Sequence, residues 1–463
     1  MFEIRQRGST VGREVLGGVT TFMAMSYILF VQPAVLSKAG MDAGGVFMAT
    51  CLSGAAACVL MGLLANYPIA LAPGMGENFF FVFTLCGVGT AAGAFKLSWP
   101  EALALTAATG VLFLLLSTVG FRSRVLNAIP DALKSGIAAG IGLFIALIGF
   151  EWGNLVTHDA VTCVKLASMK GNYVAGLTLL GLAVTLALLA FRVRGAILIG
   201  ILVATAATWG AGRIWGVPGV TWQGLLAAPK GLGKTAGEFL GGFGSLAGKL
   251  LSKDALHVLS FAFILLFMDL FDTVGTLVGV AKRAGLMSDG KLPRAERALA
   301  ADAAGTVVGA ALGSSTVTSY IESITGVSSG ARTGLAAIVA GGCMLLALLF
   351  QPLVMMVGGG VKVGQYAWGD PILRYPMIAP ALIVVGAMMM RAMRDVKWDD
   401  MTEALPGFLA MVTMPFAYSI SAGIAIGFVS YAFGKLVSGR ARECPAIVYV
   451  FAVLFVLQYV LLM

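Results

Sequence analysis

Long apolar runs separated by short polar stretches occupy almost the whole chain, and a helix needs about 20 such residues to cross a bilayer. Candidate spans in the first half lie at 18–37, 46–65, 78–91, 101–120, 133–151, 175–191 and 194–212. Those in the second half lie at 257–281, 297–313, 318–330, 332–356 and 374–391, followed by apolar residues at 402–438 and 446–462. Prolines interrupt this last part, so we expect about fourteen spans, with fifteen as the alternative count. The pattern predicts an all-α polytopic membrane protein.

The spans fall into two sets of seven. Residues 1–215 hold the first set, residues 216–254 form a connecting loop, and residues 255–463 hold the second set. Lys and Arg gather in the cytoplasmic loops of membrane proteins. Here the basic residues before span one and after spans four, six and eight fall on one side; they are Arg5, Arg7, Arg13, Arg122, Arg124, Lys134, Arg192, Arg194, Lys282, Arg283, Arg294 and Arg297. We therefore expect a cytoplasmic amino terminus and an extracytoplasmic connecting loop. Because seven is odd, the second set enters the membrane upside down, which makes an inverted repeat.

Two apolar segments are too short and too polar to cross as plain helices, and each is the third of its set. They read "APGMGENFFF" at 72–81 and "GSSTVTSYIESITG" at 313–326. Their Pro, Gly, Ser and Thr residues predict an extended entry followed by a short helix, which is allowed at membrane depth only where protein or a water-filled cavity covers the backbone. Paired broken segments of this kind indicate the binding site of a transporter. Two ordinary kinked helices are the alternative.

Composition supports a membrane protein and excludes other classes. Of the 463 residues, 59% are hydrophobic and only 11% are charged, against roughly a quarter charged in soluble proteins, so a soluble globular enzyme is excluded. The net charge of +9 comes from short loops, where membrane orientation explains it better than nucleic-acid binding. The six cysteines lie mostly inside apolar runs without CxxC spacing, so we expect neither a metal site nor a cofactor. We expect a multi-pass protein of the cytoplasmic or plasma membrane.

Carboxylates inside the apolar segments are the first functional candidates, because each costs about 2.5–3.5 kcal/mol at a helix centre and is rarely kept without a role. They are Glu77, Asp269, Asp272, Asp302 and Glu322. On a helix, three- and four-residue spacings form one polar stripe that must face protein, and it consists of Asp269, Asp272, Thr273 and Thr276. Gly275 and Gly279 beside the stripe predict close helix packing. Asp302 either supports the site from behind or makes a structural hydrogen bond or salt bridge.

The two broken segments and the stripe together predict a binding site. It would contain two carboxylates, an amide, a phenol and an aromatic ring, from Asp272, Glu322, Asn78, Tyr320 and Phe79. This set suits a flat, neutral heterocycle that stacks on the ring and donates N–H groups to the carboxylates. An inorganic anion fits poorly, because no Lys or Arg lies in these segments. A carboxyl group at low dielectric retains its proton readily, so a proton is the natural coupling ion, and sodium is the competing hypothesis.

Five motifs, in chain order, resemble the nucleobase/cation symporter family, specifically its azaguanine-resistance branch of adenine, guanine and hypoxanthine permeases. They read "TTFMAMSYILFVQPAVL", "APGMGENFFF", "FMDLFDTVGTL", "GSSTVTSYIESITGVSSGARTGL" and "MPFAYSISAGIAIGFV". The resemblance covers nearly the whole chain. It implies fourteen spans in two inverted repeats, a core bundle that holds substrate beside a gate bundle, and proton-coupled uptake, often by a homodimer. It also places substrate ligands at Asp272, Glu322, Phe79, Asn78, Tyr320 and Thr276.

One position departs from this branch. Where an apolar residue is expected, the chain has Glu77, and Phe80 replaces a residue that is commonly small. Glu77 would either point into the cavity as an additional proton site or turn away and pair with a polar group. The candidate proton carriers are therefore Asp272, Glu322, Glu77 and Asp269. The alternatives to purine uptake are a uracil or xanthine permease and, from another class, an anion channel or exchanger on the same scaffold.

Overall fold

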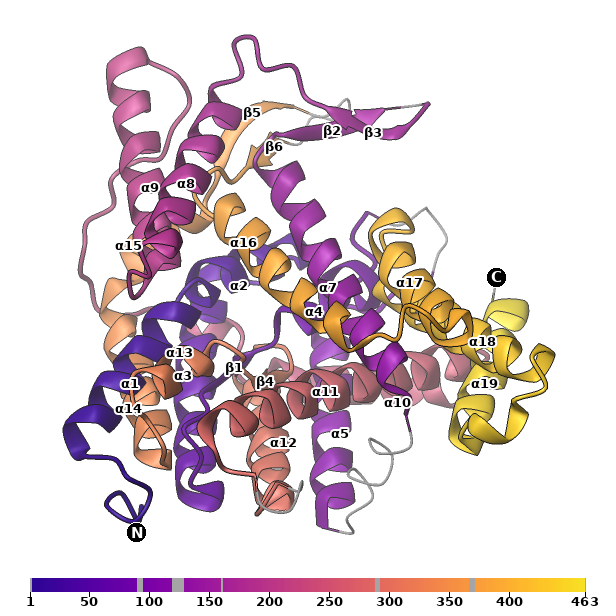
Figure 1. The fold of residues 1–463 in the computed structure, drawn as a ribbon. Helices are drawn as coiled ribbons and strands as arrows, with labels where there is room; N and C mark the ends of the chain where they lie inside the picture. Colours follow the sequence, from indigo (N-terminus) through magenta and orange to yellow (C-terminus); the bar gives the residue numbers. More distant parts are fainter. Residues whose placement is uncertain are drawn as a thin grey trace.

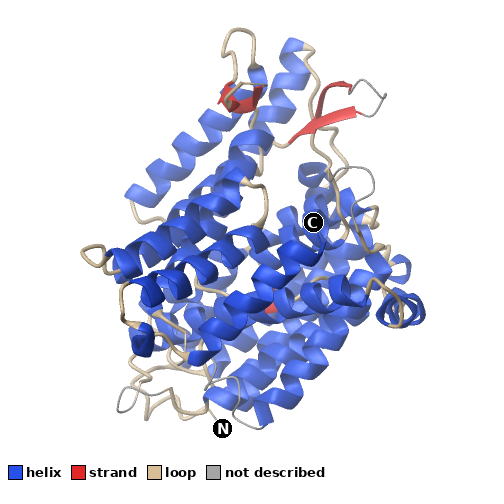
Figure 2. Ribbon diagram, turned by 90° about the vertical axis from the view of Figure 1, so that its right-hand side faces the viewer, coloured by secondary structure: helices blue, strands red, loops and turns tan. Residues whose placement is uncertain are grey.

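The computed structural model describes residues 2–89, 95–118, 129–159, 161–287, 292–365 and 371–462. Within these ranges, nine helices are long and apolar enough to cross a membrane. Helices therefore dominate the chain, and strand is confined to short pieces at the centre and the periphery (Figure 2). The all-α polytopic class is confirmed. The ends of the expected spans at 78–91 and 101–120, and the basic residues Arg122 and Arg124, lie outside the described residues.

The helices pack into two bundles. The first, which we call the core bundle, contains α1 (Val11–Met25), α2 (Ile28–Leu36), α3 (Ala43–Leu60), α4 (Met75–Phe79), α5 (Trp99–Thr118), α11 (Ala255–Ala284), α12 (Ala295–Leu312), α13 (Ser323–Ser328), α14 (Gly334–Ala347) and α15 (Gln351–Gly358). The second, the gate bundle, contains α7 (Asp131–Trp152), α8 (Tyr173–Ala190), α9 (Ala196–Trp215), α16 (Ala379–Met389), α17 (Met401–Phe416) and α18 (Ile420–Val437). Each bundle thus combines segments from both halves of the chain (Figure 1).

Small residues let the gate helices approach closely. A Cβ atom on Gly136 of α7 would lie 2.5 Å from the carbonyl oxygen of Gly407 in α17. One on Gly142 would lie 2.8 Å from the carbonyl oxygen of Gly386 in α16. Any larger residue would force these helices apart. The expectation for the core helix α11 was wrong at Gly275, where an added Cβ atom would meet nothing within 4 Å, because this position is exposed.

The two broken segments meet at the centre of the core bundle. Strand β1 (Leu71–Pro73) pairs antiparallel with β4 (Val317–Ser319), with Ala72 opposite Thr318. Short helices follow both strands, α4 after β1 and α13 after β4. The strands satisfy each other's backbone groups where neither segment is helical, which is the condition for irregular backbone at this depth. The structure therefore confirms the extended entries and excludes two ordinary kinked helices.

The Thr306 side chain holds β4 against α12. Its hydroxyl donates to the Val317 carbonyl at 3.0 Å and accepts from the Val317 N–H at 3.1 Å. Both backbone groups lie on the side of β4 that β1 leaves open. A buried backbone group without a partner is costly, so this threonine completes the hydrogen bonding of the crossing.

Two hairpins lie at the end of the molecule opposite the amino terminus (Figure 1). One pairs β2 (Val156–Asp159) with β3 (Cys163–Leu166), and the other pairs β5 (Val361–Gln365) with β6 (Pro371–Arg374). The stretch 216–254, expected to be a connecting loop, contains a helix, α10 (Glu238–Leu250), which packs on α5. The described residues after 400 form three longer helices, α17, α18 and α19 (Ala446–Leu462). Helix α19 packs on α18 and α11.

Candidate functional site

A cavity lies between the two bundles, beside the crossing of β1 and β4. It encloses about 450 Å³ of space not filled by atoms, part of it open to solvent. Polar groups from the core bundle line one side, and apolar side chains from the gate bundle line the other. The lining residues are Tyr27, Met75, Gly76, Asp272, Thr276, Thr318, Ser319, Tyr320, Ile321 and Glu322 from the core, and Ile141, Val385 and Met389 from the gate.

The structure brings four of the predicted site residues together in this cavity. Asp272 and Thr276 are one turn apart on α11, so both project from the same face. Glu322 lies at the amino-terminal end of α13, and Tyr320 lies between β4 and that helix. The Tyr320 hydroxyl donates to the Pro73 carbonyl at 2.5 Å, which ties the lining of one broken segment to the strand of the other.

Tyr27 is a site residue that the sequence analysis missed. The first span breaks between α1 and α2, and Tyr27 lies at this break with its side chain in the cavity. Its hydroxyl donates a 2.8 Å hydrogen bond to Glu322 Oε1. The bond orients the carboxylate, and hydrogen bonds to charged groups contribute about 1.5–3 kcal/mol. Tyr27 stands within "TTFMAMSYILFVQPAVL", but nothing in the spacing of that motif shows the break.

The other half of the α11 stripe faces away from the cavity. Asp269, Thr273 and Asp302 are buried behind it. The Thr273 hydroxyl donates to Asp302 Oδ1 at 2.7 Å, which joins α11 to α12. The bond anchors the helix that carries Asp272, and a supporting role of Thr273 and Asp302 in binding stays a prediction.

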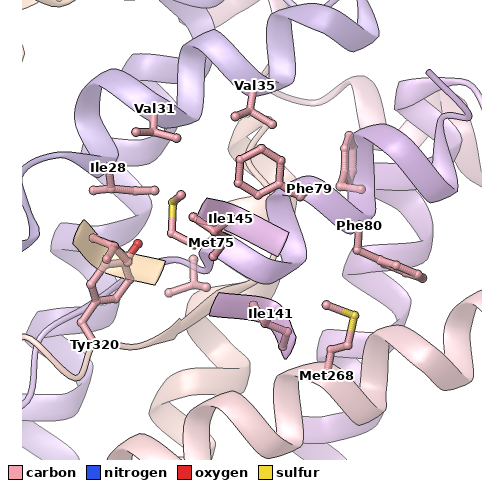
Figure 3. Packing of buried hydrophobic residues seen from close by; sticks show 14 of the residues in the cluster. Ile28, Val31, Val35, Met75, Phe79, Phe80, Ile141, Ile145, Met268 and Tyr320 are labelled. Atoms are coloured by element: carbon pink, nitrogen blue, oxygen red, sulfur yellow. The ribbon is translucent and has the colours of Figure 1, made fainter. Parts of the chain in front are cut away.

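Asn78 and Phe79 do not line the cavity. Asn78 is fully buried, and its Oδ1 accepts from the Ser315 hydroxyl, which in turn accepts a 3.1 Å hydrogen bond from Gln32 Nε2. Phe79 and Tyr320 lie on opposite sides of Met75 (Figure 3). In this conformation both predicted ligands belong to the packing around the short helix α4.

Phe79 instead joins the two bundles on the hairpin side of the cavity. Its ring centroid lies 6.1 Å from that of Phe144 and 6.4 Å from that of Trp152, both on α7. Beyond it, Lys38 Nζ lies 5.2 Å from the ring centroids of Trp152 and of Tyr375, close enough for cation–π attraction. These contacts join the two bundles on the side of the cavity that faces the hairpins.

Glu77 lies behind the cavity lining rather than in it. The side chain is fully buried on α4 and directly follows the lining residues Met75 and Gly76. A Cβ atom placed on Gly74 would collide with Glu77 Oε2 and lie 2.8 Å from Thr318 Oγ1. Both oxygens therefore border the same side of Gly74. Within the described ranges no three or more His, Cys, Asp or Glu side chains are arranged to hold a metal ion.

A second cavity lies near the hairpins, with about 510 Å³ of space not filled by atoms, part of it open to solvent. Its lining combines α2 and α15 with β6, and consists of Pro33, Ser37, Ala43, Met355, Gly358, Gly359, Leu373 and Tyr375. This lining contains no carboxylate. The cavity beside the strand crossing therefore holds the chemistry that a polar ligand needs.

Comparisons with known proteins agree with this architecture. Residues 12–426 match the sequence profile described as the Permease family. The chain is 41% identical over 470 residues to the guanine/hypoxanthine permease PbuG of Bacillus subtilis, covering 100% of this chain and 99% of that protein. It is 37% identical to the adenine permease AdeP of Escherichia coli, covering 99% of this chain and 95% of that protein.

A solved structure shares the fold. The transmembrane domain of the cyanobacterial bicarbonate transporter BicA superposes with a TM-score of 0.59 at 12% identity, covering 90% of this chain and 97% of that domain. This likeness concerns the fold alone. The sequence match to permeases extends over nearly the whole chain and includes the segments that line the cavity. The protein is therefore not an enzyme, and the chain belongs to this permease family, that of the nucleobase/cation symporters.

Proposed function

We propose that the protein is a secondary active transporter that imports purine nucleobases, with adenine, guanine and hypoxanthine as candidate substrates, together with protons. The observation that carries the proposal is the cavity in which Asp272 and Glu322 face a space between two bundles. Relatives named as guanine/hypoxanthine and adenine permeases support the substrate class. A plasma-membrane location, a cytoplasmic amino terminus and assembly as a homodimer belong to the same proposal.

The polar lining suits a purine. Two carboxylates can accept N–H groups from the ring edge, while hydroxyls from Thr276, Thr318 and Ser319 can donate to ring nitrogens or accept from them. Apolar contacts from Ile141, Val385 and Met389 can cover the ring face. None of the described side chains that line the cavity is a Lys or Arg, which disfavours an anion as cargo.

Coupling to protons is supported by the same carboxylates. Two carboxylates in one cavity repel each other when both are ionised, and a proton on one of them removes the repulsion. Purine N–H groups and a proton would then bind to the same carboxylate oxygens. Binding of the proton therefore changes the affinity for the purine, and binding of the purine changes the affinity for the proton. Sodium remains the alternative coupling ion in this proposal.

Movement of the core bundle against the gate bundle would carry the site across the membrane. The polar lining belongs to the core, and the gate contributes only apolar side chains to the cavity. Sliding along such a surface breaks no hydrogen bond to the substrate. The Phe79 contacts with Phe144 and Trp152 would then separate when the site opens toward the hairpins.

A binding competition tests the substrate class. Purified protein should bind radiolabelled hypoxanthine, and unlabelled adenine or guanine should displace it while uracil, bicarbonate and chloride do not. Displacement by uracil or xanthine alone would favour the pyrimidine or xanthine alternative. Anion currents in the absence of any purine would favour a channel or exchanger.

A further inference from the structure

Glu77 is a buried carboxyl group for which the described part of the chain provides no counter-charge. Its side chain is 0% exposed, and neither carboxyl oxygen has a hydrogen-bond partner among the described residues. An ionised carboxylate buried in this way would cost several kcal/mol. A proton removes that cost, because the neutral carboxyl group needs far less solvation.

The ionisable groups that face Glu77 strengthen this conclusion. Asp269 and Asp272 on α11, and Asp302 on α12, act on it as further acidic groups, and the Tyr320 phenol lies within electrostatic reach. The other elements packed on α4 bring no charge to it, since α2 contains no ionisable residue and α7 contributes Ile141. Glu77 therefore shares one buried region with three other carboxyl groups.

A route connects Glu77 to the substrate cavity. Thr318 lines the cavity, and its hydroxyl faces Asp272. The same hydroxyl borders Gly74 on the side where Glu77 Oε2 lies. A hydroxyl can donate and accept at once, so it can pass a proton between two carboxyl groups after a small side-chain rotation. Gly74 leaves the space that this exchange requires, because a side chain there would fill it.

We propose that Glu77 binds a second coupling proton, which it exchanges with the cavity across Thr318 and which is distinct from the proton held by the cavity carboxylates. The inference rests on the proposed proton-coupled uptake and adds one proton to each transported purine. No metal is needed, since within the described part of the chain these carboxyl groups are not arranged to ligate one ion together.

Accumulation of hypoxanthine against an imposed pH gradient tests the proposal. In proteoliposomes with the membrane potential clamped at zero, each coupled proton raises the accumulation limit about tenfold per pH unit. Wild-type protein should therefore reach about 100-fold accumulation at a gradient of one unit. Glu77→Gln should reach about tenfold. The amide resembles the protonated carboxyl group but cannot bind and release a proton. Glu77→Asp should restore the wild-type limit.

Glu101→Gln is the matched control, because Glu101 pairs with Lys249 at 2.8 Å near the connecting region and lies outside the acidic group. It should keep the wild-type limit. An unchanged accumulation limit in Glu77→Gln would overturn the proposal of a second coupling proton, but it would not contradict proton-coupled purine uptake. Binding of hypoxanthine without any response of wild-type accumulation to the pH gradient would overturn proton coupling and the second proton together.

The pH dependence of stability provides a readout that does not need transport. The folded protein would hold a proton on Glu77 that the unfolded chain releases, so raising the pH from 5 to 8 should lower the Tm of the wild type. Glu77→Gln should reduce this loss and Glu101→Gln should not. An equal decrease in Tm between pH 5 and pH 8 for the wild type and Glu77→Gln would contradict proton binding by Glu77, even if the variant were inactive in transport.

Discussion

Tyr27 and Glu322 show how the site is built at the scale of single residues. They are separated by 295 positions in the chain, yet a 2.8 Å hydrogen bond joins them inside the cavity. The phenol holds the carboxylate in one orientation, which prepares it to accept the N–H groups of a ligand. Preorganisation of this kind lowers the cost of binding.

Replacing Tyr27 by Phe should weaken hypoxanthine binding by about 10- to 100-fold, because the hydrogen bond to a charged group contributes about 1.5–3 kcal/mol. Equilibrium binding to purified protein measures the effect. Tyr67→Phe is a matched control, since the buried Tyr67 hydroxyl has no hydrogen-bond partner within the described ranges. Equal affinities of the Tyr27→Phe and Tyr67→Phe variants would remove Tyr27 from the site.

The sequence predicted the acidic residues of the cavity better than their neighbours. Asp272 and Glu322 were identifiable because a carboxylate in an apolar segment is costly, whatever the details of packing. Asn78 and Phe79 were expected in the cavity both from the two broken segments and from the resemblance, but α4 turns them into the surrounding packing. Side-chain direction on a five-residue helix depends on its exact start, which no periodicity reveals.

At the scale of elements, the crossing of β1 and β4 positions the polar residues that the second broken segment contributes to the cavity, which are Thr318, Ser319, Tyr320 and Glu322. The broken segments were predictable, because Pro, Gly, Ser and Thr interrupt two apolar runs at equivalent places. The pairing of Ala72 with Thr318 was not, because it is a contact between distant parts of the chain. The support from Thr306 was not, because it depends on how α12 packs against β4. The helix α10 was missed since its short run lies among Gly and Lys residues typical of a loop.

Thr306→Val should destabilise the crossing. The substitution leaves the N–H and C=O groups of Val317 without their side-chain partner, which costs about 1–3 kcal/mol. Thermal unfolding of purified protein should show a lower Tm than for the control Thr50→Val, whose hydroxyl bonds only to the Val46 carbonyl of its own helix at 2.7 Å. A Thr306→Val protein as stable as the control would show that the crossing does not need this support.

At the scale of the whole molecule, two bundles meet around a cavity to which the core contributes the polar residues and the gate contributes apolar side chains. The division into core and gate follows the resemblance and is seen in the packing of the helices (Figure 1). Lys38 of the core lies against Trp152 and Tyr375 of the gate on the hairpin side. In the proposed movement of the bundles, these contacts would favour the conformation in which this side is closed.

Lys38→Met should open the hairpin side more often, because the variant keeps the length of the side chain but loses two cation–π contacts of about 0.5–2 kcal/mol each. A cavity cysteine, Ser319→Cys, in a background without the six native cysteines should react at least about fivefold faster with an impermeant maleimide added from that side. Lys362→Met, on the exposed face of β5, is the control. Equal labelling rates in both variants would exclude Lys38 as part of the closure.

Uptake of radiolabelled hypoxanthine into proteoliposomes under an imposed pH gradient tests the central claim most directly. Wild-type protein should accumulate the purine when the outside is acidic and should stop when the gradient is collapsed. Asp272→Asn and Glu322→Gln should each abolish accumulation while the protein remains folded in the membrane. Accumulation that does not depend on the pH gradient, or full uptake by either variant, would contradict proton-coupled purine transport through this cavity.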